Sequence, residues 1–490
     1  MRLPLTLESL DRTICHFAES NNMTRNGNNF LQRQNSSSPL MSGASAALGL
    51  LILINLFNYI DRYVLAAVVT DIDRSFFSSP GRTGVGVADF LIKFEQLFGF
   101  TPKAALEGSL STAFMVMYMV AAPIFGRLAE RRSRWVLIGV GVSLWSLASG
   151  ASGLAPTFLA LLLTRCLVGI GEAAYGPVAP ALISDLYPLK VRGQVLSWFY
   201  MAIPVGTALG YVLGEQVARG GLGISGNAAL ASSEAWRWAF YVVMPPGLVL
   251  GICCLFMREP PIGQADLTVS PVRREIHWKD YLILAKTPSY VLCTLGMAAM
   301  TFAMGGIGFW MPYYLEHRPG VHGSPTTVFG MILVVTGLLA TLLGGIVGDQ
   351  LRNRFSGSYF LVSGTAMLVG FPLAWAVLQS SFPWIWVYLA LTCFCLFFNT
   401  GPTNTILANV SHPSMRATAY AVNIFFIHAF GDVISPLVIG LIKDRYSLDA
   451  AFRIVALMCL VSGLLWLWGT RYLDQDTRLA TSRISSLQGR

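Results

Sequence analysis

Four ionisable side chains lie within two strongly apolar stretches of the chain. Asp61 and Arg62 lie in NYIDRYVLAAV, and Arg165 and Glu172 lie in RCLVGIGEAAYG. A helix would place Arg165 and Glu172 two turns apart on nearly one face, about 10 Å along its axis. A carboxyl group in a low-dielectric site exchanges its proton when a nearby charge moves, whereas arginine stays charged and binds phosphate or carboxylate well. These residue types therefore suit proton exchange combined with anion binding.

The composition indicates that these stretches belong to a membrane protein. The 490-residue chain is 54% apolar and 12% charged, against about 25% charged residues in a typical soluble domain. Its mean hydropathy is +0.58. Apolar runs of about 20 residues, the length that crosses a bilayer, recur along most of the chain. A charge near the bilayer centre costs roughly 2.5–3.5 kcal/mol, so the four ionisable residues indicate buried partners or a water-filled path.

We predict an all-α membrane protein with twelve transmembrane helices in two pseudo-symmetric six-helix halves. The predicted spans are residues 46–69, 105–125, 134–153, 158–183, 190–213, 237–257, 289–312, 325–347, 357–378, 383–409, 415–441 and 451–472. Between them, DFLIKFEQLFGF in the loop 70–103 and RREIHWKDYLILAK in the loop 258–286 are predicted to be amphipathic helices at the membrane interface.

The predicted domain organisation follows from these spans. Residues 1–44 are rich in Asn and Ser and form a disordered tail, and no apolar stretch typical of a signal peptide follows the first basic residues. Residues 45–257 form the N-terminal half, 258–286 a linker and 287–473 the C-terminal half. Residues 474–490 form a second tail.

The distribution of basic residues predicts the orientation. The net charge is +9, and 22 of the 34 Lys and Arg residues lie in the tails and in the loops on one side of the spans. The opposite side has 9, so the positive-inside rule places both termini in the cytoplasm, in a cell or inner membrane. Basic residues in short loops set orientation here, and we expect no nucleic-acid partner.

A sequence repeat supports the two halves. GRLAERRSR at 126–134 recurs as GIVGDQLRNR at 345–354, each with a Gly that lets helices approach, an acid and then basic residues. We expect these loops to form a charge network at the cytoplasmic rim that favours one conformation. Its residues are Gly126, Glu130, Arg131, Arg134 and Asp349. Two such halves are the arrangement of secondary transporters.

These motifs resemble those of known transporters. The loop at 126–134 resembles the major facilitator superfamily signature, with Glu130 where Asp is more usual, and Arg165-x-x-x-Gly169-x-Gly171 resembles its fourth-helix motif. NYIDRYVLAAV, with GIGEAAYGPVAPALISDLYP and FYMAIPVGTALGYVLG, is similar to the Spinster family. That resemblance implies proton-linked transport of lysophospholipids or sphingosine-phosphate-type lipids. An NYxDR first helix also occurs in organic anion:cation symporters of the superfamily.

The resulting hypothesis assigns a role to each charge. Asp61 and Glu172 exchange protons, with Glu172 nearer the substrate, and Arg62 and Arg165 bind the anionic headgroup in a central cavity together with Glu172. Two alternatives remain open. Asp61 and Arg62 anchor the first helix at the interface, or Arg165 forms a structural salt bridge with Glu172 or Asp61.

Other polar features have weaker assignments. His428 and Asp432 are spaced i, i+4 and can pair, for packing or for gating. Pro204 and the Pro245–Pro246 pair are expected to kink or break their helices. Gly206, Gly210 and Gly214 form a close-packing face.

The preferred function is proton-linked, alternating-access transport of an amphiphilic anionic lipid. The alternatives are a proton-coupled symporter of a small organic anion and, from another class, a non-transporting receptor or scaffold. Enzyme motifs such as the P-loop, HExxH and G-x-S-x-G are absent from the sequence, and we expect no cofactor and no metal. The expected partners are a small-molecule substrate, protons and the lipid bilayer, around a monomer.

Overall fold

Twelve long helical segments make up the computed structural model of the chain. It describes residues 43–77, 84–129, 131–187, 189–220, 234–261, 278–352, 354–411 and 416–480, and in these ranges the regular structure is helical. The predicted disordered tail 1–44 lies almost wholly outside the described residues. So does most of the predicted linker, whose described part contains α11, Trp278–Ala285.

The first half contains six of these segments. They are α2 (Ala44–Ala67) continuing into α3 (Val69–Phe77), α5 (Lys103–Ala129), α6 (Arg134–Leu154), α7 (Phe158–Ala173) continuing into α8 (Val178–Leu186), α9 (Leu189–Ala218) and α10 (Arg237–Cys254). Helix α4 (Val85–Phe98) is a shorter helix between α3 and α5.

The second half contains the other six. They are α12 (Pro288–Glu316), α13 (Pro325–Arg352), α14 (Ser358–Gln379), α15 (Trp384–Phe398) with α16 (Thr400–Val410), α17 (Arg416–Ile427) with the π-helical turn η3 (His428–Asp432) and α18 (Ser435–Arg445), and α19 (Leu448–Gly469). The short helix α20 (Leu473–Leu479) follows.

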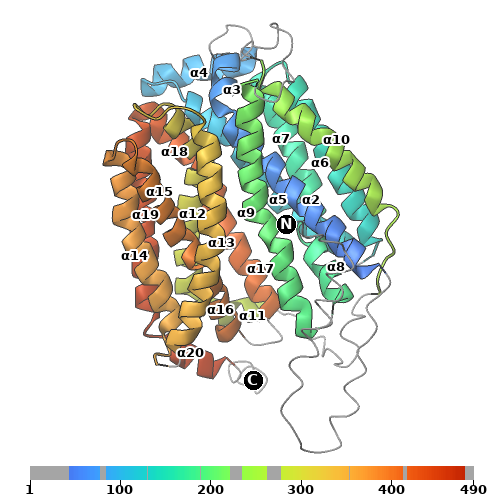
Figure 1. The fold of residues 1–490 in the computed structure, drawn as a ribbon, viewed down its shortest axis with the longest axis vertical. Helices are drawn as coiled ribbons and strands as arrows, with labels where there is room; N and C mark the ends of the chain where they lie inside the picture. Colours follow the sequence, from blue (N-terminus) through green and yellow to red (C-terminus); the bar gives the residue numbers. More distant parts are fainter. Residues whose placement is uncertain are drawn as a thin grey trace, which may run out of the picture.

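The predicted fold class is confirmed. Within the described residues, eleven helical segments are long and apolar enough to cross a membrane. Helix α9 is the twelfth; it is 30 residues long and runs beside α2 and α13 (Figure 1). Of the kinks or breaks expected at Pro204, Pro245 and Pro246, the breaks do not occur, because α9 and α10 each continue through these residues. Interruptions lie instead between α7 and α8, at Asn399, and at η3.

The two halves share one packing scheme. In the first half α2 packs on α9, α6 on α10 and α5 on α7; in the second half α12 packs on α17 and η3, α14 on α19 and α13 on α15. The interface between the halves repeats the same symmetry, because α5 packs on α18 and α13 packs on α9. Helix α2 also contacts α12, so it lies at the boundary between the two halves.

The halves are joined at the side of the bundle that carries α3 and α4, which Figure 1 shows at the top and which we call the upper side. The opposite, lower side carries α8, α11 and α20. At the upper side Thr70 donates a hydrogen bond to Glu316 (2.7 Å), and Glu215 accepts one from the Thr327 amide (2.7 Å). These contacts hold the halves together at the upper end of the central cavity.

Helices α5 and α18 meet through backbone. A Cβ atom at Gly108 would collide with the Pro436 carbonyl, and one at Gly440 would collide with the Ala104 carbonyl. Asp444 of α18 accepts hydrogen bonds from the amides of Ala104 (2.9 Å) and Ala105 (2.8 Å). It therefore caps the first turn of α5, whose amides lack partners within the helix. One half supplies the cap for a helix of the other.

Helix α4 fits the predicted interfacial helix in DFLIKFEQLFGF. Phe90, Phe94 and Phe98, one turn apart, contact one another in sequence as tilted ring pairs, with ring centroids 5.7 and 4.5 Å apart. Phe90, Leu97 and Phe98 are exposed on the described surface. Exposed aromatic residues next to a membrane span are typical of a helix that lies in the interface.

The predicted glycine face lies between α9 and α2. A Cβ atom at Gly206 would lie 2.6 Å from the Leu56 carbonyl oxygen, one at Gly210 2.7 Å from the Ile60 carbonyl oxygen, and one at Gly214 2.6 Å from the Ala67 Cβ. The absence of side chains lets α9 approach the α2 backbone just beside Asp61 and Arg62. This contact fixes the helix that carries both residues.

Substituting Gly210 by Ala is expected to destabilise the protein, because the added methyl group has no space against the Ile60 carbonyl. We expect a loss of about 1–3 kcal/mol, which overrides the gain in helix propensity. The measurement is the melting temperature in detergent. Gly49→Ala in α2 is the matched control, because a Cβ there meets no atom within 4 Å. Equal melting temperatures for the two variants would contradict the packing described here.

Candidate functional site

A cavity of about 240 Å³ lies between the halves, beneath the joined upper side. Its wall is largely apolar, with Phe114, Met304, Phe329 and Phe397 among the side chains that form it. In the described part of the chain, the charged side chains in the wall are those of Arg62, Arg165 and Asp432.

Arg62 and Glu172 form a buried ion pair. Arg62 Nη2 and Nε lie 2.6 and 2.7 Å from Glu172 Oε2. The guanidinium also lies against three aromatic rings, with its carbon 5.0 Å from the ring centroids of Tyr59 and Phe114 and 5.4 Å from that of Tyr118. Aromatic faces attract a cation, so these rings hold Arg62 at the cavity wall without neutralising it.

Asp61 and Arg165 are both held by helix α6. Asp61 accepts a short hydrogen bond from Ser149, and Arg165 Nη2 donates one to Ser152 Oγ at 2.6 Å. The two serines are three residues apart and face the same side of α6. Arg165 also lies over the Phe240 ring, 5.1 Å from its centroid. One face of a third helix thus sets the positions of both charges.

The four predicted residues therefore gather in two layers. Arg62 and Arg165 line the cavity, while Asp61 (0% exposed) and Glu172 (1% exposed) lie behind its wall. Both acids are buried, as expected. All four residues were expected to face the cavity, but of these four only the two arginines line it. Asp61 Oδ2 and Glu172 Oε1 are buried without a hydrogen-bond partner among the described residues.

The structure separates the alternatives for Arg165. Within the described residues Glu172 pairs with Arg62, and Arg165 has no carboxylate within 4 Å. The predicted spacing on one helix face was right, but two turns of helix keep the two side chains apart while α2 brings Arg62 to Glu172. The predicted alternative of a salt bridge from Arg165 to Glu172 or Asp61 is therefore wrong in this conformation.

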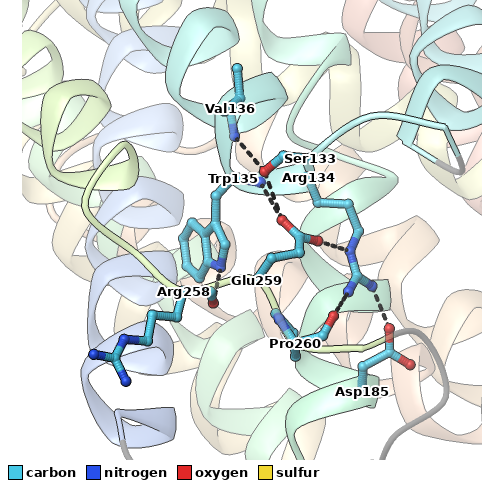
Figure 2. A network of polar contacts seen from close by, with 8 residues as sticks. All are labelled: Ser133, Arg134, Trp135, Val136, Asp185, Arg258, Glu259 and Pro260. Carbon is cyan, nitrogen blue, oxygen red and sulfur yellow. Dashed lines mark hydrogen bonds and ion pairs between the residues drawn. The ribbon is translucent and has the colours of Figure 1, made fainter.

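A polar network lies at the start of α6 (Figure 2). Arg134 donates hydrogen bonds to Asp185 at the end of α8, to Glu259 Oε1 (2.6 Å) and to the Pro260 carbonyl (2.7 Å). Glu259 in turn accepts a hydrogen bond from Ser133 at 2.8 Å. The network ties α6, α8 and the segment after α10 together at the lower side.

The remaining residues of the predicted gate motif have different surroundings. Glu130 lies outside the described residues, and Arg131 is exposed. Asp349 accepts a hydrogen bond from Tyr359 at 2.8 Å. The expected close approach at Gly126 is wrong in this conformation, because a Cβ there would meet no atom within 4 Å. Among the described residues, therefore, no neighbouring helix lies against Gly126.

Sequence reasoning missed the partners that come from other elements. Ser149, Ser152, Asp185 and Glu259 have common residue types at ordinary positions, and no pattern marks them as partners. Glu107 carried a signal, since it is an acid at the start of an apolar span. It is 1% exposed and lies 3.9 Å from Lys443 Nζ across the interface between the halves.

A second, polar cavity of about 390 Å³ lies at the upper side. Glu215, Glu316, Asp71 and Arg219 line it. Burial raises the pKa of Asp71, and the nearby Arg74 guanidinium opposes that rise. In the described ranges, no three His, Cys, Asp or Glu side chains lie close enough together to hold a metal ion.

The chain matches the sequence profile of the Major Facilitator Superfamily over residues 51–431. It is 33% identical over 470 residues to Protein spinster homolog 1 of Mus musculus, covering 89% of this chain and 82% of the relative. It is 31% identical over 473 residues to Sphingosine-1-phosphate transporter SPNS2 of Danio rerio, covering 90% of this chain and 87% of the relative.

Two solved structures have a similar fold. One is a bacterial homolog to the human lysosomal transporter Spinster in an inward-facing and unoccupied conformation. It superposes with a TM-score of 0.70 at 23% identity, covering 90% of this chain and 98% of that chain. The other is the inward open xylose transporter XylE from E. coli, with a TM-score of 0.67 at 15% identity, covering 88% and 99%. At these identities they show the fold alone.

Substituting Arg134 by Ala is expected to lower the melting temperature, because Asp185 and Glu259 lose their shared cation. We expect a loss of about 1–3 kcal/mol, since both carboxylates are partly accessible to water. Arg131→Ala is the matched control, and its exposed side chain should change the stability by no more than about 0.5 kcal/mol. A control that is as unstable as Arg134→Ala would show that the network has no special role.

Proposed function

From this chain's membership of the Spinster family of the major facilitator superfamily, we propose that it transports an amphiphilic anionic lipid by proton-linked alternating access. As a member of that family it is a multi-pass membrane transporter and not an enzyme. The proposal concerns the substrate class, the proton coupling and the role of each residue.

The observation that carries the proposal is the ion pair on the cavity wall. Arg62 faces the cavity, yet its charge is balanced from behind by Glu172, 2.6 Å away. When Glu172 takes up a proton, Arg62 loses its partner and gains affinity for an anion in the cavity. When an anion binds Arg62, Glu172 is released to accept a proton. Proton uptake and headgroup binding therefore favour each other.

Asp61 and Arg165 extend the same logic. Asp61 has a buried oxygen, Oδ2, that has no hydrogen-bond partner among the described residues, and this oxygen can take up a proton. Arg165 has no carboxylate within 4 Å among the described residues, so its guanidinium can turn toward a headgroup in the cavity. We assign Asp61 and Glu172 to proton exchange, and Arg62 and Arg165 to substrate binding.

The apolar wall supports an amphiphile. Aromatic and aliphatic side chains make up most of the cavity lining around the two arginines, as an acyl chain requires. The volume of about 240 Å³ accommodates a headgroup and the first part of a chain. The Danio rerio relative is named as a transporter of sphingosine-1-phosphate. This lipid has a phosphate headgroup on a long chain.

A proton-coupled symporter of a small organic anion is the second candidate. The two arginines of the cavity favour it, but a small polar anion would leave the apolar wall unused. A receptor or scaffold without transport is the third, and a flux assay in liposomes distinguishes it. We also propose that both termini face the cytoplasm and that the protein works as a monomer, with the lower side open to the cytoplasm here.

Substituting Glu172 by Gln is expected to uncouple transport from protons. The amide keeps the shape of the side chain but cannot take up a proton or balance Arg62. In proteoliposomes, stimulation of lysophospholipid uptake by a pH gradient should disappear, whereas exchange of lipid across the membrane without a gradient should persist.

Glu95→Gln is the matched control for this measurement. Glu95 is an exposed acid of the same type on α4, away from the cavity, and its substitution should leave pH stimulation intact. If Glu172→Gln keeps the pH stimulation of the unmodified protein, the coupling role is wrong. If it abolishes exchange and pH stimulation together and also lowers the melting temperature, the ion pair is structural.

A further inference from the structure

An acid is buried in the contact between α5 and α18 at the upper side, outside the wall of the central cavity. Glu107 is 1% exposed and comes directly before Gly108, where α5 packs on the Pro436 carbonyl. Its Oε2 lies 3.9 Å from Lys443 Nζ, beyond hydrogen-bonding distance. No amide, alcohol, ammonium or guanidinium group of the described residues donates to this oxygen. A carboxyl group in such a place needs a proton or a full counter-charge.

A second carboxyl group lies beside it. Asp73 of α3 is hydrogen-bonded to Glu107. A carboxylate only accepts hydrogen bonds, so one member of such a pair carries the proton that it donates. Two like charges in contact away from water repel each other strongly, and the two groups titrate as a unit. The pair of Asp73 and Glu107, which we call the upper carboxyl pair, therefore has one proton and one negative charge.

Lys443 of α18 balances that single negative charge. Its ammonium group lies 3.5 Å from the centroid of the Tyr313 ring and 4.7 Å from that of Trp310. Both rings belong to α12, and aromatic faces attract a cation without neutralising it. They hold the ammonium group near the upper carboxyl pair, so the second half supplies the positive charge and the first half the negative one.

The other charged groups nearby have separate roles. Asp444 of α18 is close enough to act on Glu107, but it is already bonded to the amides of Ala104 and Ala105. Lys103 lies one turn before Glu107 on α5, and among the ion pairs of the described residues Glu107 has Lys443 as its partner. The proton of the upper carboxyl pair is therefore not replaced by a second cation.

The upper carboxyl pair lies where the halves must separate. Helices α3 and α5 belong to the first half and α18 to the second, and Figure 1 shows α3 and α18 near the upper end. When α5 and α18 separate, water reaches both acids, each of them can ionise, and Lys443 leaves with the second half. A bound proton thus favours the closed upper side, and loss of that proton favours the open one.

We propose that Asp73 and Glu107 form a second proton site, which controls the opening of the upper side. The pair holds one proton while α5 and α18 are in contact and releases it to the upper solution as they separate. This inference rests on the proposed alternating access, but not on the roles of Asp61 and Glu172. It gives the pH of the upper solution an effect on which side of the protein is open.

The experiment measures the separation of the halves at the upper side. Spin labels on Leu154→Cys and Trp384→Cys, exposed residues at the upper ends of α6 and α15, report this distance in lipid nanodiscs, in a background without other reactive cysteines. We expect the population with separated upper ends to rise as the pH is raised. Glu107→Gln should keep the low-pH population at every pH, because its amide donates to Asp73 as the protonated carboxyl group does.

Asp73→Asn tests the pair through its less buried member. The amide donates to Glu107 without a shared proton, so Glu107 stays ionised beside Lys443 down to a lower pH. The pH midpoint of the opening should therefore fall by at least about one unit. A merely structural contact between the two side chains would change the stability of the protein but leave this midpoint in place.

Glu95→Gln is the matched control. Glu95 is an exposed acid on α4 at the same side of the bundle, and its substitution should leave the pH response of the unmodified protein intact. A distance in the unmodified protein that does not change with pH overturns the inference. So does a Glu107→Gln variant that opens with the pH response of the unmodified protein, or an Asp73→Asn variant with an unchanged midpoint.

Glu172→Gln separates this inference from the proposed function. Glu172 lies behind the wall of the central cavity, so the upper side of this variant should still open with pH. Opening that follows pH and depends on Glu107, in a protein without pH-stimulated transport, supports the upper carboxyl pair and overturns the proposed proton coupling. A pH response that is lost in Glu172→Gln and kept in Glu107→Gln overturns the upper carboxyl pair alone.

Discussion

The burial of charge inside an apolar helix bundle is the constraint on which the rest of this structure depends. Arg62 and Glu172 each carry a charge where a bilayer-spanning protein has no bulk water, and each would be costly alone. Their 2.6 Å contact makes both tolerable, but only while α2 and α7 hold a fixed relation. The glycine face of α9 and the aromatic side chains of α5 maintain that relation. A substitution that shifts either helix acts on the charges as well as on the packing.

Helix α6 has a central place in the first half although it contributes nothing to the cavity wall. Its serines hold Asp61 and Arg165, and its first turn is fixed by the network of Arg134, Asp185 and Glu259. The same helix thus connects the buried charges with the lower side, where the linker between the halves begins. A movement of the start of the linker relative to α8 would therefore change the position of α6. The hydrogen bonds to the buried charges and those of the Arg134 network therefore both involve residues of α6.

Much of this organisation could be predicted from the sequence, and the limits have physical reasons. Span lengths, the repeat at 126–134 and 345–354, and acids beside arginines in apolar runs are local signals, so they gave the twelve-helix fold and the four central residues. Tertiary partners are not local. The sequence around Glu172 does not indicate that Glu172 forms an ion pair with Arg62 rather than with Arg165. The π-turn before Asp432 depends on packing against α12, and the α7–α8 interruption falls where no expected helix breaker was assigned.

The contact between α5 and α18 has a mechanical consequence. At Gly108 and Gly440 the two helices touch through main-chain atoms, without side chains that interdigitate. Because main-chain atoms meet at these two points, a small tilt of one half against the other would need no rotamer change there. The Asp444 hydrogen bonds to the first amides of α5 oppose separation of the two helices, as do the hydrogen bond from Thr112 to the Val433 carbonyl (2.6 Å) and the approach of Lys443 to Glu107 (3.9 Å). A line along which two helices meet through main-chain atoms is suited to act as a pivot between the halves.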